Sequence, residues 1–189
     1  PDVQDLLNRC LAVSERVGLR LSDLMLALSG DIDGAEIDAM CIADPEHAYG
    51  RHVLLDGEFS EIMIASWTRG VRCAPHDHGG SVGAVRVLRG EGLHRVWTIK
   101  NGLIQLVLEE VVRPGDIVSC GPDMVHSLGD NGAQDKLATL HMYAGPIAAQ
   151  TVYDVAANRT LVVGGGAWVP GPEDIKAQCP GLVLRGAIA

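Results

Sequence analysis

From Tyr49 onward, the chain consists of short runs of β-branched and apolar residues separated by Gly, Pro, Asn and Asp. Such runs predict short strands bounded by turns. Lys100-Asn101-Gly102 is a hairpin signal, because Asn-Gly suits the left-handed backbone of a tight turn. Many short strands at even spacing are typical of a sandwich or barrel, with a double-stranded jelly roll as the natural candidate. The predicted strands cover residues 51–56, 59–67, 84–89, 93–99, 102–112, 116–119, 124–128, 136–143, 150–155 and 160–163.

The segment before these strands has a helical pattern. Residues 2–29 place apolar side chains at roughly helical spacing, with acidic residues in the first turn and Gly18 as a stop. A second helix is predicted over Ser22–Leu28, with Ser22 as its N-cap. At this length one domain is expected. It comprises residues 1–189, with a helical cover over 1–44, a β-barrel over 45–163 and an irregular tail over 164–189 wrapped on the barrel.

The composition narrows the class of partner and the compartment. Fifteen basic against 24 acidic residues give a net charge of -9, which argues against nucleic acid or an anionic membrane as a partner. The five cysteines are scattered and form no C-x-x-C pair, so we expect a reducing, cytoplasmic compartment. The chain has no apolar run long enough to span a membrane and no signal-peptide pattern. A monomer or small homo-oligomer is expected.

Two histidines one residue apart, His76 and His78, form the main candidate site. On a strand they point to the same side of the sheet, where two imidazoles can bind one divalent metal. A third candidate ligand, His126, follows the turn Pro114-Gly115-Asp116. The histidine pair lies in the spacing Gly70-x5-His76-x-His78-x4-Gly83-x6-Gly90.

This two-part pattern resembles the motif of the cupins, small β-barrels that carry a metal in the mouth. The fold class implied is therefore all-β, a cupin (double-stranded β-helix or jelly-roll barrel) with N-terminal helices. An ordinary cupin has a Glu shortly after the second histidine, and here Gly83 holds that place. Three neutral imidazoles suit iron, zinc, copper and nickel alike. A bound divalent ion would keep its full charge and attract an anionic ligand such as a thiolate.

Further residues resemble one cupin family, the cysteine dioxygenases, over about residues 45–155. They are Tyr49-Gly50-Arg51, His76-Asp77-His78, Gly83, His126 and Thr139-Leu140-His141-Met142-Tyr143. The resemblance implies that His76, His78 and His126 bind Fe(II). The substrates would be dioxygen and a small carboxylated thiol, with L-cysteine the first candidate. Both oxygen atoms would end on the sulfur and give a sulfinic acid.

The same resemblance implies roles for the other residues. Arg51 would bind the substrate carboxylate, for which the planar guanidinium is suited, and Tyr49 would face the same way. Tyr143 would place its hydroxyl beside the iron. His141 and Thr139, two and four residues earlier on the same strand face, would form a hydrogen-bond relay to it.

The chain also departs from the family. Mammalian cysteine dioxygenases have, at the place of Gly83, a cysteine crosslinked to the tyrosine, so Tyr143 is expected to be unmodified. The family's Ser-Pro-Pro run after the tyrosine is Ala144-Gly145-Pro146 here. Related enzymes oxidise 3-mercaptopropionate or mercaptosuccinate, and both stay open as substrates. For a dicarboxylic thiol, Arg72 and Arg86 are candidates for a second cation. Cys73 is interpreted as a core residue and not as a ligand.

Two other classes of function also remain open. One is a zinc- or manganese-dependent isomerase or lyase built on the same barrel, which would act without consuming dioxygen. The other is a non-catalytic cupin that binds a metal or ligand. It would bind without turnover.

Overall fold

The computed structural model describes residues 2–31, 34–164, 168–172, 175 and 183–187. The helical elements precede the strands. They are α1 (Val3–Ser14), α2 (Leu21–Leu28) and a 3-10 helix, η1 (Gly34–Met40). The strands are β1 (Tyr49–Asp56), β2 (Ser60–Trp67), β3 (Val82–Arg89), β4 (Gly92–Lys100), β5 (Leu103–Val112), β6 (Ile117–Cys120), β7 (Val125–Asp130), β8 (Ala138–Ala144), β9 (Ala149–Asp154), β10 (Arg159–Gly164) and β11 (Val183–Ala187).

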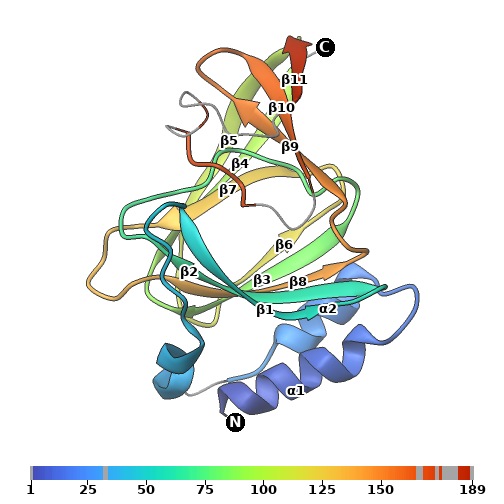
Figure 1. Cartoon of the computed structure of the whole chain (residues 1–189), viewed down its shortest axis with the longest axis vertical. Helices are drawn as coiled ribbons and strands as arrows, with labels where there is room; N and C mark the ends of the chain where they lie inside the picture. Colours follow the sequence, from blue (N-terminus) through green and yellow to red (C-terminus); the bar gives the residue numbers. More distant parts are fainter. Residues whose placement is uncertain (1, 32–33, 165–167, 173–174, 176–182, 188–189) are drawn as a thin grey trace.

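The strands form two facing layers, as Figure 1 shows. One layer is a five-stranded sheet of order β1-β2-β8-β3-β6. The other consists of two three-stranded sheets, β5-β4-β7 and β11-β10-β9. All strand pairs are antiparallel. This is the expected cupin barrel, and the fold prediction is confirmed.

An extended connection between β2 and β3 joins the two smaller sheets. His76 in this connection forms β-bridges with His126 of β7 and with Val152 of β9. Its backbone N–H donates to the His126 carbonyl at 2.8 Å, and the His126 N–H donates back at 3.0 Å. One candidate ligand therefore also completes the second layer of the barrel.

Alternation along the five-stranded sheet separates two cores. Ile62, Ile64, Leu140 and Met142 face outward and pack with α1 and α2, which cover that side of the barrel in Figure 1. Each fully buried aliphatic side chain there contributes roughly 1.5–3 kcal/mol. The alternate residues face the barrel interior, where the second cluster includes Met63, Ala65 and Val85. The period-two pattern of β2 and β8 thus directs one set of side chains to the helices and the other to the pocket.

The predicted helix start at Ser22 is wrong. The helix α2 begins at Leu21, and its N-cap is Arg20. The Asp23 carboxylate accepts a hydrogen bond from the Arg20 N–H at 2.9 Å, which places the N-cap two residues before the predicted Ser22. In α1 the expected acidic start is present, because the Asp2 side chain accepts from the Asp5 N–H at 2.8 Å.

The predicted strands are all present, with ends shifted by at most two residues. The prediction of an irregular tail is wrong in part, because β11 pairs with β10. Sequence patterning also missed η1, a short segment with two acidic residues and little apolar periodicity.

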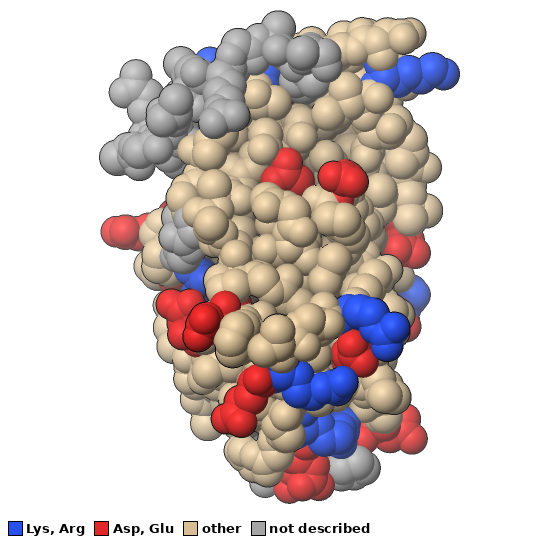
Figure 2. All heavy atoms as spheres, turned by 90° about the vertical axis from the view of Figure 1, so that its right-hand side faces the viewer, with Lys and Arg blue, Asp and Glu red and all other residues tan. Residues whose placement is uncertain are grey.

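Charged side chains are unevenly placed on the face drawn in Figure 2. Basic and acidic residues lie side by side toward the helical end, and most of the middle is uncharged.

Within the described part of the chain, no helix has the length and apolar character needed to cross a membrane.

Candidate metal centre

Three histidines meet inside the barrel. One ring nitrogen from each of His76, His78 and His126 lies within 4.8 Å of the others, and all three side chains are buried. His126 comes from β7. His76 and His78 come from the extended connection before β3 and not from a regular strand, although their spacing still brings both rings to one point.

The ring nitrogens are oriented for a shared ion. The His76 Nδ1 donates to the Ala74 carbonyl at 2.9 Å, which leaves its Nε2 as the ligand atom. The Nε2 atoms of His78 and His126 face each other at 3.3 Å. Two nitrogens bound to one ion at about 2.1 Å lie about 3.0–3.4 Å apart for angles between octahedral and tetrahedral. The donor set therefore fits one divalent metal.

Burial keeps these ligands neutral. It lowers the pKa of His78 to about 2, helped by repulsion from His76 and His141. Burial, with repulsion from His78 and His76, holds the pKa of His126 well below its usual value. The pKa of His76 is lowered too, again through burial. A neutral imidazole is the form that binds a metal, so the site needs no deprotonation near neutral pH.

Asp77, between the two ligands, fixes their segment and does not point to the site. Its Oδ1 accepts from the N–H groups of Gly79 at 3.0 Å and Thr151 at 2.9 Å. Gly79 has a φ of +61°, and a β-carbon there would lie 2.0 Å from the Ala149 carbonyl oxygen. The glycine after the motif is required because the connection passes so close to β9.

A fourth histidine, His94, contacts His126 from the side away from His78. The His94 Nε2 lies 3.2 Å from the His126 Nδ1, and the His94 Nδ1 lies 2.9 Å from the Glu110 carboxylate. The chain of contacts Glu110–His94–His126 orients the ligand ring, as carboxylates behind metal-bound imidazoles do. The sequence analysis missed His94, which has no ligand spacing and meets His126 only through the β4–β7 register.

The predicted row on β8 forms a continuous set of hydrogen bonds. Thr139 Oγ1 lies 2.8 Å from His141 Nε2, and His141 Nδ1 lies 2.9 Å from the Tyr143 hydroxyl. Burial lowers the pKa of His141 to about 3 and raises the pKa of Tyr143 well above its usual value. Both groups are therefore neutral at neutral pH.

Trp67 extends this row and orders its protons. Its Nε1–H donates to Thr139 Oγ1 at 2.9 Å. An indole N–H can only donate, so the arrangement that satisfies the whole row directs the Thr139 proton to His141 Nε2. His141 then donates from Nδ1 to the Tyr143 oxygen, and the tyrosine's own proton is available to the pocket.

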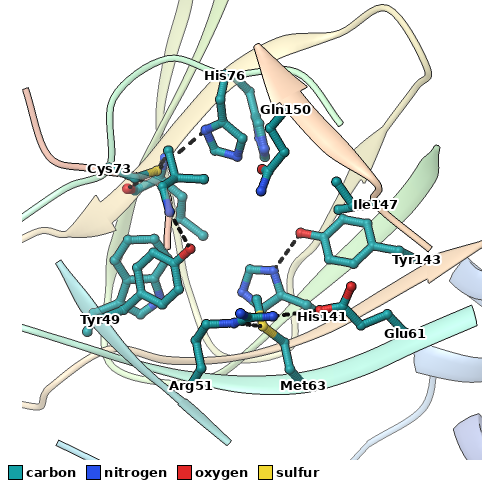
Figure 3. A pocket seen from close by; sticks show the side chains of 14 residues that line it. Tyr49, Arg51, Glu61, Met63, Cys73, His76, His141, Tyr143, Ile147 and Gln150 are labelled. Atoms are coloured by element: carbon teal, nitrogen blue, oxygen red, sulfur yellow. Dashed lines mark hydrogen bonds and ion pairs between the residues drawn. The ribbon is translucent and has the colours of Figure 1, made fainter. Parts of the chain in front are cut away.

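A buried ion pair lies opposite His76 in the pocket (Figure 3). The Arg51 Nη2 lies 2.8 Å from the Glu61 Oε1, with side-chain exposures of 10% and 9%. The Arg51 Nε also donates to the Met63 sulfur at 3.3 Å. Burial raises the pKa of Glu61, while Arg51 acts in the opposite direction. Tyr49 lines the same pocket, and its hydroxyl accepts from the Val169 N–H at 3.2 Å.

Six of the eight predicted site residues line one pocket. His78 and Thr139 are not among its lining residues, and they contact the lining residues His126 and His141. Its lining includes Tyr49, Arg51, His76, His126, His141 and Tyr143, and it adds the residues Glu61, Met63, Trp67, Cys73, Leu128, Ile147, Gln150 and Val169. Glu61 had a recognisable signal, a lone charge in the apolar run of β2. Gln150 had none, because it reaches the pocket from β9 across the barrel.

Neither candidate for a second cation lies in this pocket. Arg86 is buried against α2, where its Nη1 donates to the Leu28 carbonyl. Arg72 lines a separate cavity beside Arg95 and Glu109. Cys73 is buried in the interior cluster and its Sγ donates to the Leu128 carbonyl at 3.2 Å. Burial raises its pKa to about 12, so the thiol is protonated.

Comparison with known proteins adds the family. The sequence model of the family described as cysteine dioxygenase type I matches residues 12–156. Among solved structures, an uncharacterised protein from Klebsiella pneumoniae with a double-stranded β-helix domain is 20% identical, covering 58% of this chain and 87% of that one, with a TM-score of 0.45. A protein from Thermus thermophilus is 18% identical, covering 58% and 94%, with a TM-score of 0.48.

Proposed function

The chain belongs to the cysteine dioxygenase type I family, and on that premise we propose that it is an Fe(II)-dependent thiol dioxygenase. It adds both atoms of dioxygen to the sulfur of a small carboxylated thiol, converting R–SH to R–SO2H. L-cysteine is the first candidate substrate. The observation that carries the proposal is the buried three-histidine site beside the Trp67–Thr139–His141–Tyr143 row, in a chain of this family.

Iron fits the donor set. His76, His78 and His126 would hold it through neutral nitrogens, with His94 and Glu110 behind His126. When bound, the metal supplies a Lewis-acidic, redox-active centre that lowers the thiol pKa and holds sulfur and dioxygen in reach of each other.

The remaining residues position the substrate and a proton. Arg51 binds the carboxylate, and Tyr49 shapes the adjacent wall. Tyr143 offers its hydroxyl proton to the reacting groups, with His141 and Thr139 holding the oxygen in place. Apolar residues such as Met63 and Ile147 limit water near the sulfur.

Oxygen uptake by the Fe(II)-loaded protein tests the proposal. L-cysteine, 3-mercaptopropionate and mercaptosuccinate are supplied in turn, and the product mass is recorded. We expect uptake with a gain of two oxygens on one thiol, and its loss together with bound iron in His126→Ala. Product without oxygen consumption would point to the isomerase or lyase class. Thiol binding without turnover would point to a ligand-binding protein.

A further inference from the structure

The arginine assigned to the substrate carboxylate is already paired with a carboxylate of the protein. Glu61 and Arg51 are the charged side chains among the described residues that line the pocket, and they contact each other at 2.8 Å. Both are nearly buried, so bulk water screens them little. Figure 3 shows the Glu61 carboxylate on the wall between Arg51 and Tyr143. Glu61 stands directly opposite Tyr143 in the β2–β8 register, which fixes it at the site.

Glu61 offsets the positive charge of Arg51. That positive charge therefore cannot also balance a second carboxylate of the substrate. Histidines bind a metal as neutral imidazoles, and the Arg51–Glu61 pair sums to zero, so the described residues that line the pocket bring no net charge to the site. A divalent metal is then balanced by one thiolate and one carboxylate. A second carboxylate would leave an uncompensated negative charge in a buried site, which is costly.

We propose that Glu61 is a specificity-determining residue that makes this pocket select thiols with one carboxylate and reject dicarboxylic thiols. The inference rests on the proposed function and deepens it. Without the Glu61 charge the balance reverses: a monocarboxylic thiol leaves one excess positive charge, and a dicarboxylic thiol is neutralised.

Two ligands isolate this effect. Mercaptosuccinate is 3-mercaptopropionate with one added carboxylate, and neither carries an amine. We would measure the Kd of both for the Fe(II)-loaded protein without oxygen, in wild type and in Glu61→Gln. Glu61→Asp keeps the charge, and Glu61→Met is a second neutral variant if Gln folds poorly. Glu58→Gln makes the same charge change at an exposed position before β2 and is the matched control.

Wild type should bind 3-mercaptopropionate more tightly than mercaptosuccinate. In Glu61→Gln the ratio of the two Kd values should shift toward mercaptosuccinate by about tenfold or more, since like charges at close range discriminate at least that strongly. Glu61→Asp and Glu58→Gln should keep the wild-type preference. A ratio within about twofold of wild type in both neutral variants would overturn the proposal, as would a wild-type preference for mercaptosuccinate or no binding of either thiol. Selective binding without oxygen uptake would instead count against the dioxygenase and leave the Glu61 assignment standing.

Discussion

The ring of Tyr143 lies against Gly83, so closely that a β-carbon on the glycine would sit 2.4 Å from Cδ1 and 2.6 Å from Cε1 of the ring. The two residues are partners in the β3–β8 register. Real β-carbons do not approach this closely, so any side chain at position 83 requires the ring to move. The glycine thus sets the place of the tyrosine whose hydroxyl contacts His141.

Gly83→Ala should therefore destabilise the protein and displace the Tyr143 hydroxyl. We expect a loss of about 1–3 kcal/mol, as for overpacked cores, with slower turnover. Denaturant unfolding and oxygen uptake measure the two effects. Gly121→Ala is the control, because a β-carbon there meets nothing within 4 Å. Equal stability of the two variants would show that the ring moves at little cost.

Glu110→Gln should weaken metal binding through His94. Loss of the carboxylate removes the group that holds the His94 ring, and His94 is the residue that contacts His126. Changes of this kind typically cost about 10–100-fold in metal affinity, and a metal titration with a competing chelator measures it. Glu109→Gln on the same strand is the control, since Glu109 pairs with Arg95 instead. The same affinity in both variants would contradict a supporting role for His94.

Arg51→Gln should cost more stability than the double variant Arg51→Gln/Glu61→Gln. The single change leaves the Glu61 carboxylate buried without its cation, a loss of about 3–5 kcal/mol in comparable sites. The double change leaves no such charge. Urea unfolding of both variants and of Glu61→Gln completes a double-mutant cycle. Additive effects would mean that the two groups are not coupled in solution.

His141 should make the metal-free protein less stable as the pH falls. Its pKa is about 3 in the folded protein against an ordinary value of 6.5, so the unfolded chain binds more protons below pH 6.5. Stability therefore rises with pH across this window. Between pH 7 and pH 5 this one group accounts for about 2 kcal/mol. His141→Gln should show that much less pH dependence in denaturant unfolding, and an unchanged slope would contradict a buried neutral imidazole.

Tyr143→Phe should separate metal binding from chemistry. The Tyr143 hydroxyl contacts His141. Among the described residues, no hydrogen bond joins it to a ring nitrogen of His76, His78 or His126. Iron content should stay at the wild-type level, while turnover slows or oxygen is consumed without an equal amount of sulfinate. Parallel measurement of oxygen uptake and product tests this. Unchanged coupling would make the hydroxyl a bystander.

Features that depend on neighbouring residues were predictable from the sequence. The strands and the turn at Lys100-Asn101-Gly102 follow from alternation and turn chemistry. The row Thr139–His141–Tyr143 follows from period-two spacing on one strand. The three histidines of the cluster were recognisable because their spacing resembles the two-part cupin motif.

Contacts across the barrel were decided by strand register and layer packing. The Arg51–Glu61 pair, the contact of His94 with His126, and Gly83 beneath the Tyr143 ring join segments that local patterns do not relate. The same holds for Arg72 and Arg86, whose charge alone did not show that they lie outside the pocket. Side-chain alternation determines which face a residue takes, but only the pairing of distant strands determines which residues meet on that face.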